Sequence, residues 1–189
     1  MRASTMGFIP YATQSINEDD LAAVRAVLTS GWLTQGPAVP RFERAFAQRH
    51  SVAHAVAVAN ATAGLHIACL ALGAGPGARV WTSPNSFVAS ANCALYCGAD
   101  VDFVDIDPAT RNLSVPALAE QLVRAERDGR LHAIVIPVHF AGLPCDLAPL
   151  GALADRYGFK IIEDASHAVG ASYDGQPIGS RYADASVFS

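Results

Sequence analysis

One stretch decides the fold class, Lys160-Ile161-Ile162-Glu163-Asp164-Ala165-Ser166-His167. It is a short apolar run without polar alternation, and it ends in two acids and a nearby histidine. Such a run is typical of a strand covered on both faces, as strands of parallel sheets are. Ligands of open α/β sheets bind beyond the carboxyl ends of the strands. The polar residues that follow this run are therefore candidates for a functional site.

Similar apolar runs recur along the chain and alternate with segments of helix length. The strand-like runs are His54–Ala59, Arg79–Ser83, Val101–Ile106, Ala133–Val138, Lys160–Glu163 and one that begins near Ala185. The helix-like segments are Thr62–Leu72, Phe87–Cys97, Val115–Asp128 and Leu147–Tyr157, preceded by helices from Asn17 to Gly31 and from Pro40 to His50. The alternation predicts an α/β fold in one domain, with a mainly parallel sheet flanked by helices.

The composition of the chain argues against a disordered protein, a membrane-spanning protein and a nucleic-acid-binding protein. Hydrophobic residues make up 51% of the chain and charged residues 16%, which argues against disorder. No apolar run approaches the roughly 20 residues of a membrane span, and a net charge of −4 without a basic stripe argues against nucleic acid as a partner. The histidines and acids form no recognisable metal set. Cys93 and Cys97 stand one helical turn apart, a spacing that allows metal binding but is more often that of two packed thiols. We expect free thiols and a cytoplasmic protein.

The helix predicted at Thr62 begins directly after the first strand-like run, in Asn60-Ala61-Thr62-Ala63-Gly64. Small side chains there would let an anion approach the backbone N–H groups, where the helix dipole is positive. An ordinary strand-to-helix turn with a threonine cap is the alternative.

Two further junctions suggest that a planar ring is bound. Phe87 follows a strand end and could lie flat on such a ring, although core packing is the simpler interpretation. Asp164 would keep a ring nitrogen protonated, because a nearby opposite charge favours the charged form. His167 could hydrogen-bond an oxygen of the same ring. The alternatives are a cap made by Asp164 and a histidine satisfied within the fold.

Together these junctions resemble the DegT/StrS family of pyridoxal 5′-phosphate (PLP) dependent sugar aminotransferases. The similarity runs from Ile9 to Ser189, and within the family it is greatest to transaminases of pseudaminic acid biosynthesis. The motifs are Ser30-Gly31-Trp32-Leu33-Thr34-Gln35-Gly36-Pro37, Asn60-Ala61-Thr62-Ala63-Gly64-Leu65, Phe87-Val88-Ala89-Ser90, Ile136-Pro137-Val138-His139-Phe140-Ala141-Gly142 and Glu163-Asp164-Ala165-Ser166-His167-Ala168.

The resemblance implies a role for each matching residue. The cofactor phosphate would be held near Thr62 and Ala63 with the Ser189 hydroxyl, and Phe87 would stack on the ring. Asp164 would pair with the ring nitrogen, and His167 would lie near the phenolic oxygen. A nucleotide-sugar would face a second set, which comprises Tyr11, Gly31, Trp32, Leu33, Thr34 and Ala61.

The resemblance also implies that residues 1–189 are the N-terminal part of the PLP-binding large domain of a fold-type-I aminotransferase, truncated before its remainder. The family's Schiff-base lysine follows in a Ser-Phe-His-x-x-Lys stretch, whose serine would be Ser189. No catalytic residue is therefore assigned, and we expect the chain alone to be inactive. Lys160, the single lysine, would stand about 13 Å from Asp164, at the other end of its strand.

The implied activity is transfer of an amino group from glutamate to C4 of a UDP-4-keto-6-deoxy-hexose, in a homodimer with shared active sites. Two alternatives are a family dehydratase, in which histidine replaces the lysine, and a non-catalytic module for nucleotide-sugar binding or dimerisation. A nicotinamide-dependent dehydrogenase is disfavoured, because the first strand-to-helix turn lacks GxGxxG.

Overall fold

The computed structural model describes residues 13–131 and 134–189. It divides into two compact units, Met1–Phe42 and Glu43–Ser189. Helix α1 (Glu18–Leu28) lies in the first unit, and α2 (Ala38–His50) begins there and ends in the second. Among the described helices, none is both long and apolar enough for a membrane crossing.

Helix α1 begins with a capping box, as the acids after Asn17 predict. The Asn17 side chain accepts the amides of Asp19 and Asp20, and the Asp20 carboxylate accepts the Asn17 amide at 2.9 Å. The helix ends at Leu28, so the prediction that Gly31 ends it was wrong. The hydroxyls of Thr29 and Ser30 donate to the last-turn carbonyls, which stops the helix earlier.

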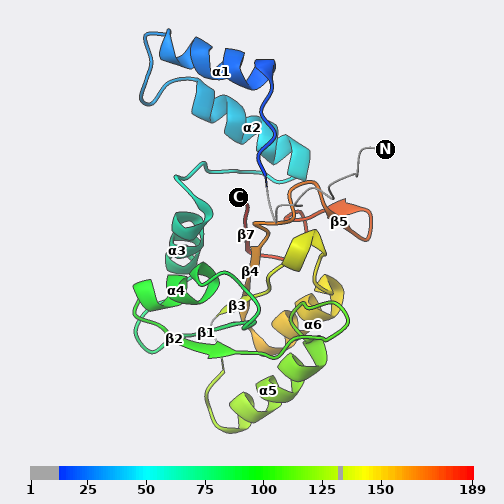
Figure 1. The fold of residues 1–189 in the computed structure, drawn as a ribbon. Helices are drawn as coiled ribbons and strands as arrows, with labels where there is room; N and C mark the ends of the chain where they lie inside the picture. Colours follow the sequence, from blue (N-terminus) through cyan, green and yellow to red (C-terminus); the bar gives the residue numbers. More distant parts are fainter. Residues whose placement is uncertain (1–12, 132–133) are drawn as a thin grey trace, which may run out of the picture. The chain divides into compact units, whose positions relative to one another are not determined.

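The second unit contains a five-stranded parallel sheet, which confirms the predicted fold class (Figure 1). Its strands lie in the order β2-β1-β3-β4-β7, and each adjacent pair is parallel. The strands are β1 (Arg79–Thr82), β2 (Asp100–Phe103), β3 (Ile134–Ile136), β4 (Lys160–Asp164) and β7 (Ala185–Val187).

Helices cover both faces of this sheet (Figure 1). Helices α3 (Ala61–Ala71) and α4 (Ala89–Tyr96) pack on one face, and α5 (Val115–Arg127) and α6 (Leu147–Tyr157) pack on the other. Strand β4 serves both cores, since Ile162 packs with α3 and α4 while Ile161 packs with α5 and α6. This alternation is what the unbroken apolar run in β4 predicts.

The prediction of a buried strand at His54–Ala59 was wrong. The segment forms neither helix nor strand in the structure, and the side chain of Val56 is 78% exposed. Strand β7 pairs with β4, and the amide of Ala57 donates to the Glu43 carboxylate. An apolar pattern gives a strand only where the backbone pairs with a neighbouring strand, and in the described part of the chain this segment pairs with none.

The structure also contains a small hairpin that the sequence analysis did not predict. Strands β5 (Ser172–Tyr173) and β6 (Gln176–Pro177) pair antiparallel across Asp174-Gly175. Both turn residues have positive φ, 48° and 73°, as the primed hairpin turns need. The Asp-Gly pair was the available signal. A single 3₁₀ turn, η1 (Phe140–Gly142), follows β3.

Candidate functional site

Asp164 lies at the carboxyl end of β4, between two neighbouring strands. It pairs in register with Val187 of β7, and on its other side it forms a parallel bridge with Val138, just beyond β3. The residue is 4% exposed. Ligands of open α/β sheets bind at this end of the strands, so a buried acid here is a candidate ligand-binding residue.

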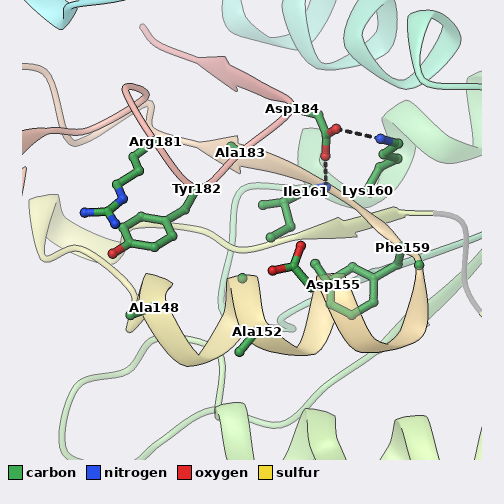
Figure 2. A pocket seen from close by; sticks show the side chains of 13 residues that line it. Ala148, Ala152, Asp155, Phe159, Lys160, Ile161, Arg181, Tyr182, Ala183 and Asp184 are labelled. Carbon is green, nitrogen blue, oxygen red and sulfur yellow. Dashed lines mark hydrogen bonds and ion pairs between the residues drawn. The ribbon is translucent and has the colours of Figure 1, made fainter.

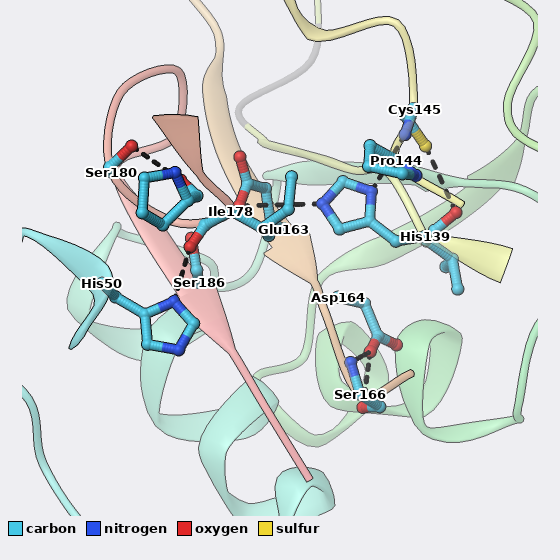
Figure 3. A network of polar contacts seen from close by, with 12 residues as sticks. His50, His139, Pro144, Cys145, Glu163, Asp164, Ser166, Ile178, Ser180 and Ser186 are labelled. Carbon is cyan, nitrogen blue, oxygen red and sulfur yellow. Dashed lines mark hydrogen bonds and ion pairs between the residues drawn. The ribbon is translucent and has the colours of Figure 1, made fainter. Parts of the chain in front are cut away.

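Two serine hydroxyls hold the carboxylate of Asp164. The hydroxyl of Ser90, in the first turn of α4, donates to Oδ2 at 2.5 Å. The hydroxyl of Ser166 donates to Oδ1 at 2.6 Å, and the Ser166 amide donates to the same oxygen at 3.2 Å (Figure 3). The residues after Asp164 therefore form a turn, closed by a hydrogen bond from the Ala168 amide to the Ala165 carbonyl.

The first turn of α3 is close to this acid through Val187. A Cβ added at Gly64 would lie 2.9 Å from Cγ1 of Val187, so only glycine lets the helix approach β7 this closely. Val187 is the register partner of Asp164, so α3 packs on the strand directly beside the strand that carries the acid. The structure thus brings together two of the predicted junctions.

The cap of α3 leaves backbone donors for an anion. The Asn60 side chain accepts the Ala63 amide at 2.9 Å, and the Asn60 carbonyl accepts the Gly64 amide. The first four N–H groups of a helix have no partner within it. Within the described part of the chain, no acceptor contacts the amides of Ala61 and Thr62. The predicted phosphate contact at Ala63 would compete with this cap, whereas Thr62 is open.

The two predicted ring-contacting side chains are exposed. Phe87 is 72% exposed, so core packing is not its role here. His167 is also exposed, and its ring meets the Phe140 ring edge-on at 6.5 Å between centroids. A Cβ at Gly142 would lie 2.9 Å from the His167 carbonyl, so η1 supports this turn closely. Ser189 is exposed at the end of the chain.

The predicted substrate residues are placed only in part. Tyr11 lies outside the described residues. Gly31, Trp32, Leu33 and Thr34 form an exposed loop in the first unit, between α1 and α2. Ala61 is the first residue of α3. Their role in binding a nucleotide-sugar stays a prediction.

A second polar group, which no sequence pattern predicted, lies on the opposite side of β4. Glu163 and His139 are fully buried, with 3.7 Å between Glu163 Oε2 and His139 Nε2 (Figure 3). Ser186 donates to Glu163 Oε2 at 2.9 Å, and the Cys145 amide donates to His139 Nδ1 at 3.1 Å. The imidazole nitrogen Nδ1 is therefore an acceptor, which places the proton on Nε2, towards Glu163. This group joins β4, β7 and the loop after β3.

Two hollows in the second unit lie away from these residues. One, of about 620 Å³, opens beside α6 and the amino end of β4, and its lining includes Lys160, Arg181 and Asp184 (Figure 2). The other, of about 260 Å³, lies between His50 and the β5–β6 hairpin. Neither contains a predicted cofactor residue. Among the described residues, no cluster of three or more histidines, cysteines or acids is arranged to hold a metal ion.

Comparison with known proteins identifies the family. The model of the DegT/DnrJ/EryC1/StrS aminotransferase family matches residues 14–189, almost the whole chain. The chain belongs to this family. Family members are PLP-dependent aminotransferases. The relatives of this chain therefore bind a planar phosphorylated ring, the kind of ligand for which Asp164, the start of α3 and Phe87 were predicted.

Solved structures of the DegT/DnrJ/EryC1/StrS family share the fold of this chain. An aminotransferase from Brucella abortus is 34% identical, with a TM-score of 0.80 over 84% of this chain and 43% of that one. Helicobacter pylori PseC, an aminotransferase involved in the biosynthesis of pseudoaminic acid, is 29% identical, with a TM-score of 0.85 over 95% and 47%. The sugar aminotransferase candidate Spr1654 from Streptococcus pneumoniae, in its PLP form, is 28% identical, with a TM-score of 0.85 over 96% and 48%.

This member of the family spans less than half the length of those structures. Its five-stranded parallel sheet and flanking helices match about half of a fold-type-I aminotransferase.

Proposed function

We propose that this chain forms the cofactor-binding floor of a PLP-dependent sugar aminotransferase. The reaction is transfer of an amino group from glutamate to C4 of a UDP-4-keto-6-deoxy-hexose, in nucleotide-sugar biosynthesis of the pseudaminic acid type. The family assignment supports the reaction class, and the similarity to Helicobacter pylori PseC supports the sugar. The observation that carries the proposal is the buried Asp164 carboxylate beside the open first turn of α3.

The residues present fit the cofactor. The Asp164 carboxylate would hold a proton on the ring nitrogen, because a close opposite charge favours the charged form. With that nitrogen protonated, PLP supplies an electron sink for the reacting carbon. Phe87 would stack on the ring, and His167 would donate to its phenolic oxygen. The start of α3 at Thr62 and Ala63 would hold the phosphate, together with the Ser189 hydroxyl.

The remaining parts of the proposal concern substrate and partners. Tyr11, Gly31, Trp32, Leu33, Thr34 and Ala61 face the nucleotide-sugar. The enzyme acts as a homodimer with shared active sites in the cytoplasm, where the free cysteines stay reduced.

Binding of pyridoxamine 5′-phosphate (PMP) tests the proposal, because this ligand binds without a covalent bond to lysine. Titration calorimetry of the chain should show binding. Asp164→Asn should weaken it by about tenfold or more, since a neutral amide replaces a charge-assisted hydrogen bond to the ring nitrogen. The matched control is Asp155→Asn, an exposed acid in the hollow at the other end of β4, which should leave the affinity unchanged.

Two results would contradict the proposal. One is a folded chain that does not bind PMP. The other is an equal loss of affinity in the Asp164 and Asp155 variants, which would mean that the ligand responds only to net charge.

A further inference from the structure

The two oxygens of the Asp164 carboxylate are not equally occupied. Oδ1 accepts both the hydroxyl and the amide of Ser166, whereas Oδ2 accepts only the hydroxyl of Ser90. A carboxylate offers about four lone-pair positions, two on each oxygen. Oδ1 is therefore full, and one position remains on Oδ2. A donor that approaches Asp164 must share the oxygen that Ser90 already holds.

Ser90 is itself held from both sides. It is fully buried, and its single hydroxyl proton goes to the carboxylate at 2.5 Å. The 2.6 Å contact with the Ser86 hydroxyl must then carry the proton of Ser86. Ser86 has a single hydroxyl proton, so donating it to Ser90 takes the place of its 3.1 Å hydrogen bond to the Phe87 carbonyl. A hydroxyl fixed by a donor and an acceptor has little freedom to rotate.

We propose that Ser90 is a positioning residue for the ring nitrogen of the cofactor. By binding Oδ2 it sets the direction in which Asp164 presents its one open lone pair. Ser166 binds only Oδ1, so it does not determine where the open lone pair of Oδ2 points. This inference rests on the proposed function, in which Asp164 binds the ring nitrogen.

The test compares PMP with its carbocyclic analogue, in which a CH group replaces the ring nitrogen. A residue that only stabilises the fold would change both affinities equally. Ser90→Ala should weaken PMP binding by about tenfold and leave the analogue within about twofold, because hydrogen bonds to charged groups are among the strong ones. The preference for PMP over the analogue therefore falls by a similar factor.

Three further variants sharpen the comparison. Ser166→Ala should reduce the preference less than Ser90→Ala, since the Ser166 amide still donates to Oδ1. Ser90→Cys keeps a side chain of similar size with a weak donor, so it should retain part of the preference for PMP over the analogue. This variant keeps the test decisive if Ser90→Ala folds poorly. Thr82→Val is the matched control, because it removes another fully buried hydroxyl, bonded to the Ile136 carbonyl, without touching Asp164. The Thr82→Val variant should prefer PMP over the analogue by the same factor as the unaltered chain does.

The outcomes separate this inference from the proposed function. If Asp164→Asn loses the preference while Ser90→Ala keeps it, the role of Ser90 is refuted and that of Asp164 stands. Equal losses in Ser90→Ala and Thr82→Val would reduce Ser90 to a structural residue. A chain that does not distinguish PMP from the analogue at all overturns both.

Discussion

Burial governs the acid–base behaviour of Cys145. The residue is almost fully buried, and its thiol donates to the Val138 carbonyl at 3.2 Å. Burial raises the pKa of Cys145 from 9.0 to about 12, because the thiolate would lose its hydration. In the unfolded chain the same thiol keeps its ordinary pKa. Unfolding therefore releases a proton from Cys145 at alkaline pH.

The stability of the second unit should consequently fall as the pH rises above 9. Below pH 9 the thiol is protonated in both states and its contribution is fully present; it is lost progressively up to pH 12. In that window one proton changes the free energy of unfolding by about 1.4 kcal/mol per pH unit. Urea unfolding between pH 8 and about pH 10.5 measures the slope. Cys145→Ser keeps a donor but does not titrate, so its slope should be shallower. Equal slopes would contradict the argument.

The first turn of α3 combines two roles, helix capping and the proposed phosphate contact. The Asn60 side chain caps the helix through Ala63, while the amides of Ala61 and Thr62 remain for an anion. Asn and Asp are about equally good caps, but only Asp is charged. A substitution between them therefore separates the stability of the helix from the binding of an anion.

Asn60→Asp should leave the free energy of unfolding unchanged within about 0.5 kcal/mol, and the helix dipole even favours the new charge. PMP affinity should fall by about tenfold at low salt, because the carboxylate repels the phosphate at close range, and should recover partly at high salt. Ser114→Asp makes the matching change at the cap of α5, on the opposite face of the sheet, and should not alter binding. Undiminished affinity in Asn60→Asp would place the phosphate elsewhere.

Elements were predictable from the sequence where local pattern and tertiary partner agree. The apolar run that ends at Asp164 predicted both β4 and the candidate acid. The prediction is confirmed because β4 lies inside the sheet with helices on both faces, which is the environment that an unbroken apolar run indicates. The contact between Ser90 and Asp164 joins residues 74 positions apart, and no local signal marks it. The prediction of a strand at His54–Ala59 was wrong for the converse reason, since its apolar pattern is local and the structure gives it no pairing partner among the described strands.

At the scale of the whole molecule, the parallel sheet separates two charged regions. Asp164 stands at the carboxyl end of β4, and Lys160 stands at the amino end, at the hollow beside α6 (Figure 2). The strand rises by about 3.3 Å per residue, so the two positions are roughly 13 Å apart. Lys160 also pairs with Asp184 at 2.9 Å, and this hydrogen bond raises the pKa of Lys160 above its usual value.

Lys160 should therefore form no covalent adduct with PLP bound at Asp164. Only the unprotonated amine attacks an aldehyde, and by raising the pKa of Lys160 the ion pair with Asp184 makes the small unprotonated fraction near neutral pH smaller still. Treatment with one equivalent of PLP and then borohydride, followed by peptide mass spectrometry, should leave the Lys160 peptide unlabelled. Asp184→Asn removes the ion pair but leaves Lys160 as far from Asp164 as before. In this variant we expect at most slow labelling of Lys160, which increases when PLP is in excess. Stoichiometric labelling of Lys160 that disappears in Asp164→Asn would instead require the two ends of β4 to serve one site, which a rigid parallel strand does not allow.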